Sequence, residues 1–159
     1  MNKAYLLLGS NMGNSHDQVK SAIQHIEKNT GKLIRKSGLY TTAAWGNTDQ
    51  PDFLNQVIII DTLLNPIETL QSILLIEKIM GRVRTTKNAP RIIDIDILFF
   101  NKEIITQADL VVPHPEIQNR RFVLVPLNEI SPRFKHPVLK KNIHQLLLDC
   151  PDHLDVKKF

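Results

Sequence analysis

Apolar residues recur along the chain with two different periods, and the two periods alternate in a regular order. Short runs of aliphatic and β-branched residues predict strands, whereas apolar positions three and four apart predict helices. Strands are expected at residues 4–9, 33–40, 53–61 and 92–100. Helices are expected at 16–29, with Ser15 as N-cap, and from Asn65-Pro66 to a stop at Gly81. The order β-α-β-β-α-β predicts an α+β, ferredoxin-like antiparallel sheet with both helices on one face.

The last third of the chain is less periodic. A hairpin turn is expected at 101–103, leading into Ile104 and Ile105, and residues 110–115 form a loop stiffened by two prolines. Two further helices are expected, at 119–130, where Pro126 should kink or break the helix, and at 143–148. We therefore expect an additional C-terminal hairpin and helices. No linker or repeat interrupts the chain, so one domain over 1–159 is predicted.

Composition narrows the class of protein. With 159 residues, 42% apolar and 23% charged, the chain can bury one globular core. A net charge of +4 and a pI near 9.3 fit an anionic ligand, either nucleic acid or a phosphorylated small molecule. Cys150 is the single cysteine, so no intramolecular disulfide forms and a reducing compartment is expected. No apolar run approaches the ~20 residues of a membrane span. A cytoplasmic protein is predicted.

The strand at 92–100 carries two acids. Because strand side chains alternate, Asp94 and Asp96 point to one face while Ile93, Ile95 and Ile97 point to the core. Two close carboxylates repel each other, and a divalent cation such as Mg²⁺ between them would remove the repulsion. The alternative is that the acids merely form the solvated face of an edge strand.

The loop before this strand is cationic, with Arg82, Arg84, Lys87 and Arg91. Arginines facing a metal-binding acid pair suggest a polyphosphate site. There is no Walker A sequence, and the turn at 9–13 lacks its lysine.

Two other residues are candidates for ligand contact. His114 lies between two prolines and could bond a phosphate or ribose, or could be an ordinary surface histidine. Trp45 lies in a polar loop, where its ring could form one wall of a binding site for a flat ligand instead of packing in the core.

The run from Ala89 to Leu98, with Pro90, Arg91, Asp94 and Asp96, resembles the signature of 6-hydroxymethyl-7,8-dihydropterin pyrophosphokinases. Other motifs at matching spacing cover nearly the whole chain. They lie at residues 9–11, 49–55, 81–84, 112–114 and 119–120. The resemblance implies transfer of pyrophosphate from ATP to the hydroxymethyl group of a reduced pterin, releasing AMP, in folate biosynthesis.

The resemblance also implies roles for individual residues. Asp94 and Asp96 would hold two Mg²⁺ ions, while Arg82 and Arg91 would engage the phosphates as catalytic groups and Arg84 would lie on a mobile loop over ATP. The remaining implied ATP-site positions are Glu77, Ile97, His114 and Arg120. On the pterin side, Phe53 and Phe122 would sandwich the ring, and its hydrogen-bonding edge would meet Thr42, Asn55 and backbone near Trp45. The implied partners are ATP and the reduced pterin, with no nucleic acid and no membrane, for a monomer.

Some positions depart from the family pattern. Leu74 stands at a glutamine position, Asp109 at an arginine and Val111 at a threonine near the nucleotide, Ala43-Ala44 replaces two prolines, and the loop 85–89 is one residue shorter.

Two classes of function without catalysis are also considered. Ferredoxin-like sheets bind RNA through aromatics exposed on central strands, but the candidate central strand here shows Asp94 and Asp96. A small-ligand regulatory domain leaves the convergence of acids and arginines unexplained.

Overall fold

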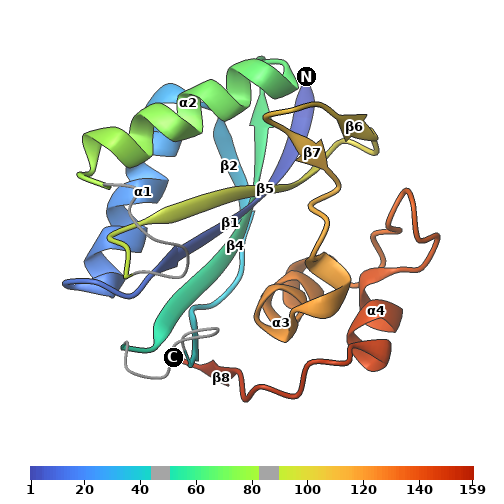
Figure 1. Ribbon diagram of the computed structural model, residues 1–159. Coiled ribbons are helices and arrows are strands. Elements are labelled where there is room, and N and C mark those ends of the chain that lie inside the picture. The colour runs from blue at the N-terminus through green and yellow to red at the C-terminus, as the bar shows by residue number, and fades with distance from the viewer. Residues whose placement is uncertain (44–50, 83–89) are drawn as a thin grey trace.

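The computed structural model describes residues 1–43, 51–82 and 90–159 (Figure 1). The chain forms these elements in order: β1 (Asn2–Ser10), α1 (Ser15–Asn29), β2 (Lys32–Lys36), β3 (Tyr40–Thr42), β4 (Phe53–Thr62), α2 (Pro66–Ile79), β5 (Asp94–Phe100), β6 (Ile105–Thr106), β7 (Val111–Val112), the 3₁₀ turn η1 (Ile117–Asn119), α3 (Arg121–Ile130), α4 (Ile143–Asp149) and β8 (Lys157–Lys158).

The main sheet is antiparallel, in the order β5-β1-β4-β3-β8, and β2 also pairs with β4. The predicted ferredoxin-like α+β order is confirmed, since the first and third strands of the motif are central. Helices α1 and α2 cover one face of the sheet, and α3 and α4 lie on the other (Figure 1).

Side-chain alternation along β1 divides the core into two layers. Leu6 and Leu8 pack with Val19 and Ile26 of α1, whereas Leu7 packs in the layer that contains α3 and α4. Both faces of β1 are therefore covered, which explains its nearly continuous apolar run.

The N-cap of α1 is Asn14, so the prediction of Ser15 was wrong. The Asn14 side chain accepts a hydrogen bond from the Asp17 N–H at 3.2 Å, while Ser15 is already helical. The predicted cap of α2 is confirmed, because Asn65 and Glu68 form a reciprocal capping box and Pro66 opens the helix.

The single strand predicted at 33–40 is divided into β2 and β3, which is a correction. Ser37 lies between them and pairs with Val57 in an unusual way: its N–H donates to the Val57 carbonyl at 2.9 Å, and its hydroxyl accepts from the Val57 N–H at 3.0 Å. A side chain thus takes the place of a backbone acceptor and interrupts the ladder. Strand β3 also extends beyond the predicted end at residue 40, because it includes Thr41 and Thr42.

The last third of the chain required several corrections. The prediction of a hairpin turn at 101–103 was wrong, because β6 pairs with β7 and the hairpin turn lies between them. The expected stiff loop at 110–115 therefore contains a strand. A 3₁₀ turn precedes α3, and Pro126 lies inside α3 without ending it. Burial of Leu127 and Ile130 after the proline holds the last turn against the sheet. Strand β8 was not predicted.

Strand β5 begins at Asp94, later than the predicted residue 92, and it lies at the edge of the sheet, so the expectation of a central strand was wrong. A bulge follows Ile97: Leu6 pairs with Ile97 and Tyr5 pairs with Phe99. Leu98 and Phe99 consequently both pack in the α3 layer. None of the helices in the described part of the chain is long and apolar enough to cross a membrane.

Candidate functional site

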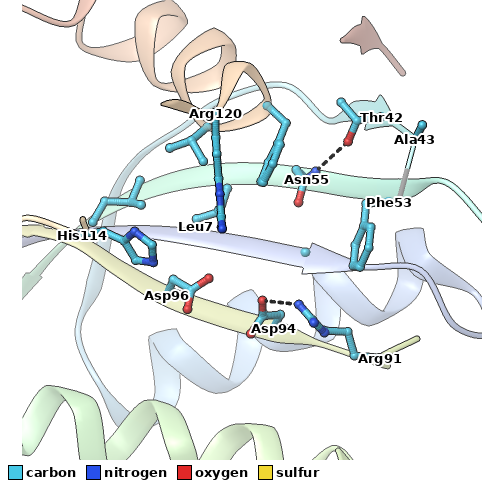
Figure 2. A pocket seen from close by; sticks show the side chains of 14 residues that line it. Leu7, Thr42, Ala43, Phe53, Asn55, Arg91, Asp94, Asp96, His114 and Arg120 are labelled. Atoms are coloured by element: carbon cyan, nitrogen blue, oxygen red, sulfur yellow. Dashed lines mark hydrogen bonds and ion pairs between the residues drawn. The ribbon is translucent and has the colours of Figure 1, made fainter. Parts of the chain in front are cut away.

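A cavity on the α3 side of the sheet is lined by residues of β1, β4, β5 and α3. Its lining brings together residues far apart in sequence, including Thr42, Phe53, Asn55, Asp96, His114 and Phe122. Figure 2 shows Asp94 and Asp96 on the same side of β5, with Arg91 near one end of the pair and His114 near the other.

The floor of this first cavity depends on Gly9. A Cβ atom at Gly9 would lie 2.6 Å from the Asn55 Oδ1, so only glycine lets that amide lie against β1. The Asn55 Nδ2 donates to the Thr42 hydroxyl at 3.3 Å (Figure 2). Both polar side chains are about 3% exposed, which fixes their hydrogen-bonding groups at the cavity wall.

Two aromatic rings line the first cavity from different elements. Phe53 begins β4 and lies 5.6 Å from the guanidinium carbon of Arg91. Phe122 lies in the first turn of α3, with the guanidinium carbon of Arg120 5.9 Å from its ring centre. Each ring therefore has a cation beside it.

Asp94 forms a network with two arginines. The Arg82 Nη1 donates to Asp94 Oδ1 at 2.5 Å and to Glu77 Oε2 at 2.8 Å, and the Arg91 Nη1 donates to Asp94 Oδ2 at 3.1 Å. Glu77 is 3% exposed and also accepts the Ile95 N–H at 2.8 Å. Helix α2 and strand β5 are thus tied together by buried charges, and the pKa of Arg82 is raised by Asp94 and Glu77 against the effect of burial.

Asp96 lies in a different environment. Burial, followed by the charges of Asp94 and Glu77, raises its pKa from 3.8 to about 8. A cation beside this carboxylate would relieve its desolvation and the repulsion from Asp94. Magnesium suits such a site, since it is commonly held by one or two carboxylates and completes its shell with water and phosphate oxygens. The described residues contain no group of three or more His, Cys, Asp or Glu side chains arranged for a metal, so phosphate and water oxygens would have to complete the shell.

A second cavity lies around the edge of β5, between α2 and β7. Its walls are mainly apolar and include Leu70, Leu74, Ile97 and Leu110, with Asp109 at the edge. Asp96 and His114 line both cavities, so the two spaces meet at these side chains. The three departures from the family pattern at Leu74, Asp109 and Val111 all belong to this second cavity.

His114 is held rigidly where the two cavities meet. The backbone N–H of His114 donates to the Leu98 carbonyl at 3.0 Å, and its ring Nδ1 accepts from the Glu116 backbone N–H at 3.1 Å. This acceptor role assigns the ring proton to Nε2 in the neutral form. Burial and the Arg120 charge lower the pKa of His114, so the ring is neutral near pH 7 and donates through Nε2.

Most of the expected site residues are brought together, but not all line a cavity. In the described ranges, Glu77 and Arg82 lie beneath the acid pair and are absent from the lining of both spaces. That they contact ATP stays a prediction. Trp45, Arg84, Lys87, Ala44 and the loop 85–89 lie outside the described residues.

Sequence reasoning missed the role of Asn11. Its Oδ1 accepts the Arg91 N–H at 2.9 Å, its N–H donates to the Arg91 carbonyl at 3.2 Å, and its Nδ2 donates to the Pro51 carbonyl at 3.2 Å. Asn11 is 2% exposed and therefore fixes the segment that carries Arg91. A buried asparagine after Gly9-Ser10 was the available signal, but its partners lie 40 and 80 residues away.

Fold and site together define a class: a ferredoxin-like α+β protein in which two cavities meet at an acid that belongs to a pair flanked by arginines. The chain belongs to the 7,8-dihydro-6-hydroxymethylpterin-pyrophosphokinase family, whose model matches residues 5–132. Enzymes of this family use ATP and a pterin as substrates.

Several named proteins are similar to this chain. The 2-amino-4-hydroxy-6-hydroxymethyldihydropteridine pyrophosphokinase of Methylorubrum extorquens is 43% identical over 83% of this chain and 84% of its own length. The enzyme of the same name from Pseudomonas aeruginosa is 36% identical over 94% of this chain and 92% of its own length. Folic acid synthesis protein fol1 of Pneumocystis carinii is 39% identical over 96% of this chain, which spans only 20% of that longer protein.

A solved structure supports the fold. The crystal structure of Plasmodium falciparum HPPK-DHPS wild type with SDX-DHP superposes with a TM-score of 0.76 over 94% of this chain and 43% of that one. The sequences are 24% identical, so this likeness is used for the fold alone.

Proposed function

We propose that this chain transfers pyrophosphate from ATP to the hydroxymethyl group of 6-hydroxymethyl-7,8-dihydropterin and releases AMP, within folate biosynthesis. One observation carries this proposal beyond family membership: two cavities of different character meet at Asp96 and His114. A reaction that joins two substrates needs such a meeting point, with charged groups directed at it.

The first cavity suits the pterin. Phe53 and Phe122 offer flat apolar faces, and Asn55 and Thr42 offer an amide and a hydroxyl for the polar edge of a heterocycle. Stacking between rings combined with a few fixed polar groups is how proteins recognise flat nitrogenous ligands.

The second cavity suits the nucleoside part of ATP. Leu70, Leu74 and Ile97 provide an apolar slot for a base, and the exposed Asp109 at the edge can accept hydrogen bonds from hydroxyl groups. The triphosphate would then extend toward Asp96, where His114 Nε2 and the arginines supply donors.

We infer that Asp94 and Asp96 hold two Mg²⁺ ions, with remaining ligands from phosphate oxygens and water. When bound, the metal would neutralise phosphate charge and polarise the β-phosphorus. Arg91, whose side chain is 25% exposed, already lies against Asp94 and is positioned to exchange this carboxylate for a phosphate oxygen. The Arg82 side chain is more buried, at 11% exposure, and forms ion pairs with both Glu77 and Asp94, so it neutralises part of the charge of the acid pair.

The reaction needs no covalent enzyme intermediate. The pterin hydroxyl oxygen forms a bond to the β-phosphorus and loses its proton to solvent, and the bond from the β-phosphorus to the bridging oxygen of the α-phosphate breaks, leaving AMP. Residues of the chain supply position and charge: stacking holds the pterin, Arg120 and Arg91 neutralise phosphate charge, and the neutral His114 donates a hydrogen bond from Nε2.

An RNA-binding role is not favoured. The sheet face away from α1 and α2 is covered by α3 and α4, and its aromatic Phe99 is buried at 1% exposure. Bases would find no open aromatic platform on this part of the described sheet.

Incubation of the purified protein with ATP, Mg²⁺ and the reduced pterin alcohol tests the proposal. We expect AMP and the pterin pyrophosphate in equal amounts, with no AMP when the pterin or the metal is withheld. ADP as the product would show ordinary phosphoryl transfer and contradict the proposed reaction.

We propose in addition that the chain acts as one domain over residues 1–159, as a monomer, in the cytoplasm. The buried single cysteine, Cys150, fits a reducing compartment because it has no second cysteine to pair with.

A further inference from the structure

Helix α3 begins without a side-chain cap of its own. Its N-cap residue is Arg120, which makes no side-chain cap hydrogen bond, although its carbonyl accepts the N–H groups of Val123 and Leu124. The first N–H groups of a helix need an acceptor from elsewhere. At α3 that acceptor comes from a residue 31 positions later: the Asp152 Oδ2 accepts the Arg121 N–H at 3.0 Å.

Asp152 is itself fixed by the backbone beyond it. Its Oδ1 accepts the Leu154 N–H at 2.9 Å, so the two carboxylate oxygens join α3 to the segment 151–159. A negative charge at a helix N-terminus is also favourable for the helix dipole.

The helix start that Asp152 caps carries two residues of the first cavity. Arg120 and Phe122 flank Arg121, and both line that cavity. The direction of the Phe122 ring depends on where α3 begins, because Phe122 lies in its first turn.

The segment 151–159 continues to the other wall of the same cavity. Its strand β8 pairs with β3, Lys157 with Thr41 and Lys158 with Tyr40, next to Thr42. Figure 1 shows this segment running from α4 past α3 to β3. It therefore connects the elements that carry Phe122 and Thr42.

We infer that Asp152 is a positioning residue for the pterin: it sets the first turn of α3, and with it the Phe122 ring, without touching substrate. This inference rests on the proposed function, specifically on the first cavity being the pterin site. It makes Asp152 a determinant chiefly of pterin affinity, because the second cavity is lined by no residue of α3 and, of the described residues, only Arg120 links this helix start to the phosphates.

The test compares Asp152→Ala with Asp152→Asn and with Asp155→Ala. Asparagine keeps one acceptor oxygen, and Asp155 is an exposed acid of the same segment whose side chain pairs with Lys157. Pterin and ATP dissociation constants and the two KM values are measured for each variant, together with thermal unfolding.

For Asp152→Ala we expect pterin binding to weaken about fivefold, the factor that corresponds to the ~1 kcal/mol of a lost cap, and ATP binding to weaken less, because only Arg120 among its proposed contacts lies at this helix start. The pterin affinity of Asp152→Asn should lie between those of Asp152→Ala and the parent, and that of Asp155→Ala should match the parent. Unchanged pterin binding in Asp152→Ala overturns the inference. Equal losses for both substrates, in step with lost stability, also overturn it, because they show a general structural role. If Asp152→Ala does not fold, Asp152→Asn is compared with Asp155→Ala instead. Weaker pterin binding in Asp152→Asn supports the inference, and equal pterin binding in the two variants overturns it.

The proposed function is tested separately by the parent protein and by Phe122→Ala. If the parent fails to bind the pterin, or Phe122→Ala binds it normally, the assignment of the first cavity is wrong and the inference falls with it. If both behave as expected and Asp152→Ala does not, only the inference fails.

Discussion

At the scale of single residues, the site combines two carboxylates with opposite surroundings. Asp94 is neutralised by Arg82 and Arg91, whereas Asp96 has a raised pKa because it is buried near Asp94 and Glu77. An apo protein with this arrangement keeps a proton on one acid where a metal ion would otherwise bind. Folding stability and metal binding are therefore linked through the same oxygen atoms.

Asp96→Asn should abolish turnover and change the pH dependence of stability. A carboxyl whose pKa rises from 3.8 to about 8 on folding binds its proton more tightly in the native state, so its contribution to stability declines as pH rises from 3.8 to 8. The free energies of unfolding of the metal-free parent and variant are measured by urea denaturation at pH 5 and 8, and between these values the parent should lose stability relative to the variant as pH rises.

A matched measurement adds Mg²⁺ at pH 8. The ion should raise the melting temperature of the parent and have little effect on Asp96→Asn. An equal rise in both proteins would contradict metal binding at Asp96.

Phe122→Ala should weaken pterin binding by about 1–3 kcal/mol, the range for loss of one stacking contact, and leave ATP binding unchanged. Titration of pterin fluorescence measures the pterin dissociation constant, and calorimetry with a non-hydrolysable ATP analogue measures the nucleotide dissociation constant. Phe122→Leu is the control, because it keeps an apolar side chain without a flat ring. A loss confined to ATP would reverse the assignment of the two cavities.

At the scale of elements, α3 serves both the site and the core. Its first turn carries Phe122, and its last turn buries Leu127 and Ile130. Arg35 of β2 donates to the Ile130 carbonyl at 2.7 Å, so an arginine from the sheet satisfies the C-terminal end of this helix. The position of the helix is thereby set from both ends by residues outside it.

The connection between α3 and α4 is held by His136, which makes it sensitive to acid. The His136 Nδ1 accepts the N–H groups of Val138 and Leu139 at 3.2 and 3.0 Å, and burial lowers the pKa of this histidine below 6.5. A lowered native pKa means that stability is present above pH 6.5 and is lost as pH falls toward the native pKa, since protonation removes the acceptor.

His136→Asn should keep an acceptor at the same place and remove the titration. The free energy of unfolding should therefore fall less between pH 7 and pH 5 in the variant than in the parent. His114, with its lowered pKa, and Asp96, with its raised pKa, contribute equally to both proteins, so the difference between their slopes reports His136. Identical slopes would show that the connection does not respond to this proton.

At the scale of the whole molecule, sequence periodicity predicted what depends on local pattern. The order of strands and helices follows from runs such as 53–61 and from caps such as Asn65, and the shared face of Asp94 and Asp96 follows from strand alternation. The division at Ser37, the bonds of Asn11 and the cap from Asp152 could not be predicted, because each depends on a partner distant in sequence. The meeting of two cavities at Asp96 likewise depends on where β7 folds against β5.

The bulge after Ile97 separates strand β5 into two halves with different phases. Before it, even-numbered Asp94 and Asp96 face the α3 layer; beyond it, Phe99 does so, and Phe100 packs with α1 and α2. Regular alternation through Leu98 would turn Phe99 toward α1 and α2 and Phe100 toward α3 while the acids kept their face, so the bulge is what places both rings. Loss of Leu98 would restore an unbroken ladder with the acids and both rings on their present faces, so a shorter strand of this kind would give up only the packing of Leu98 itself.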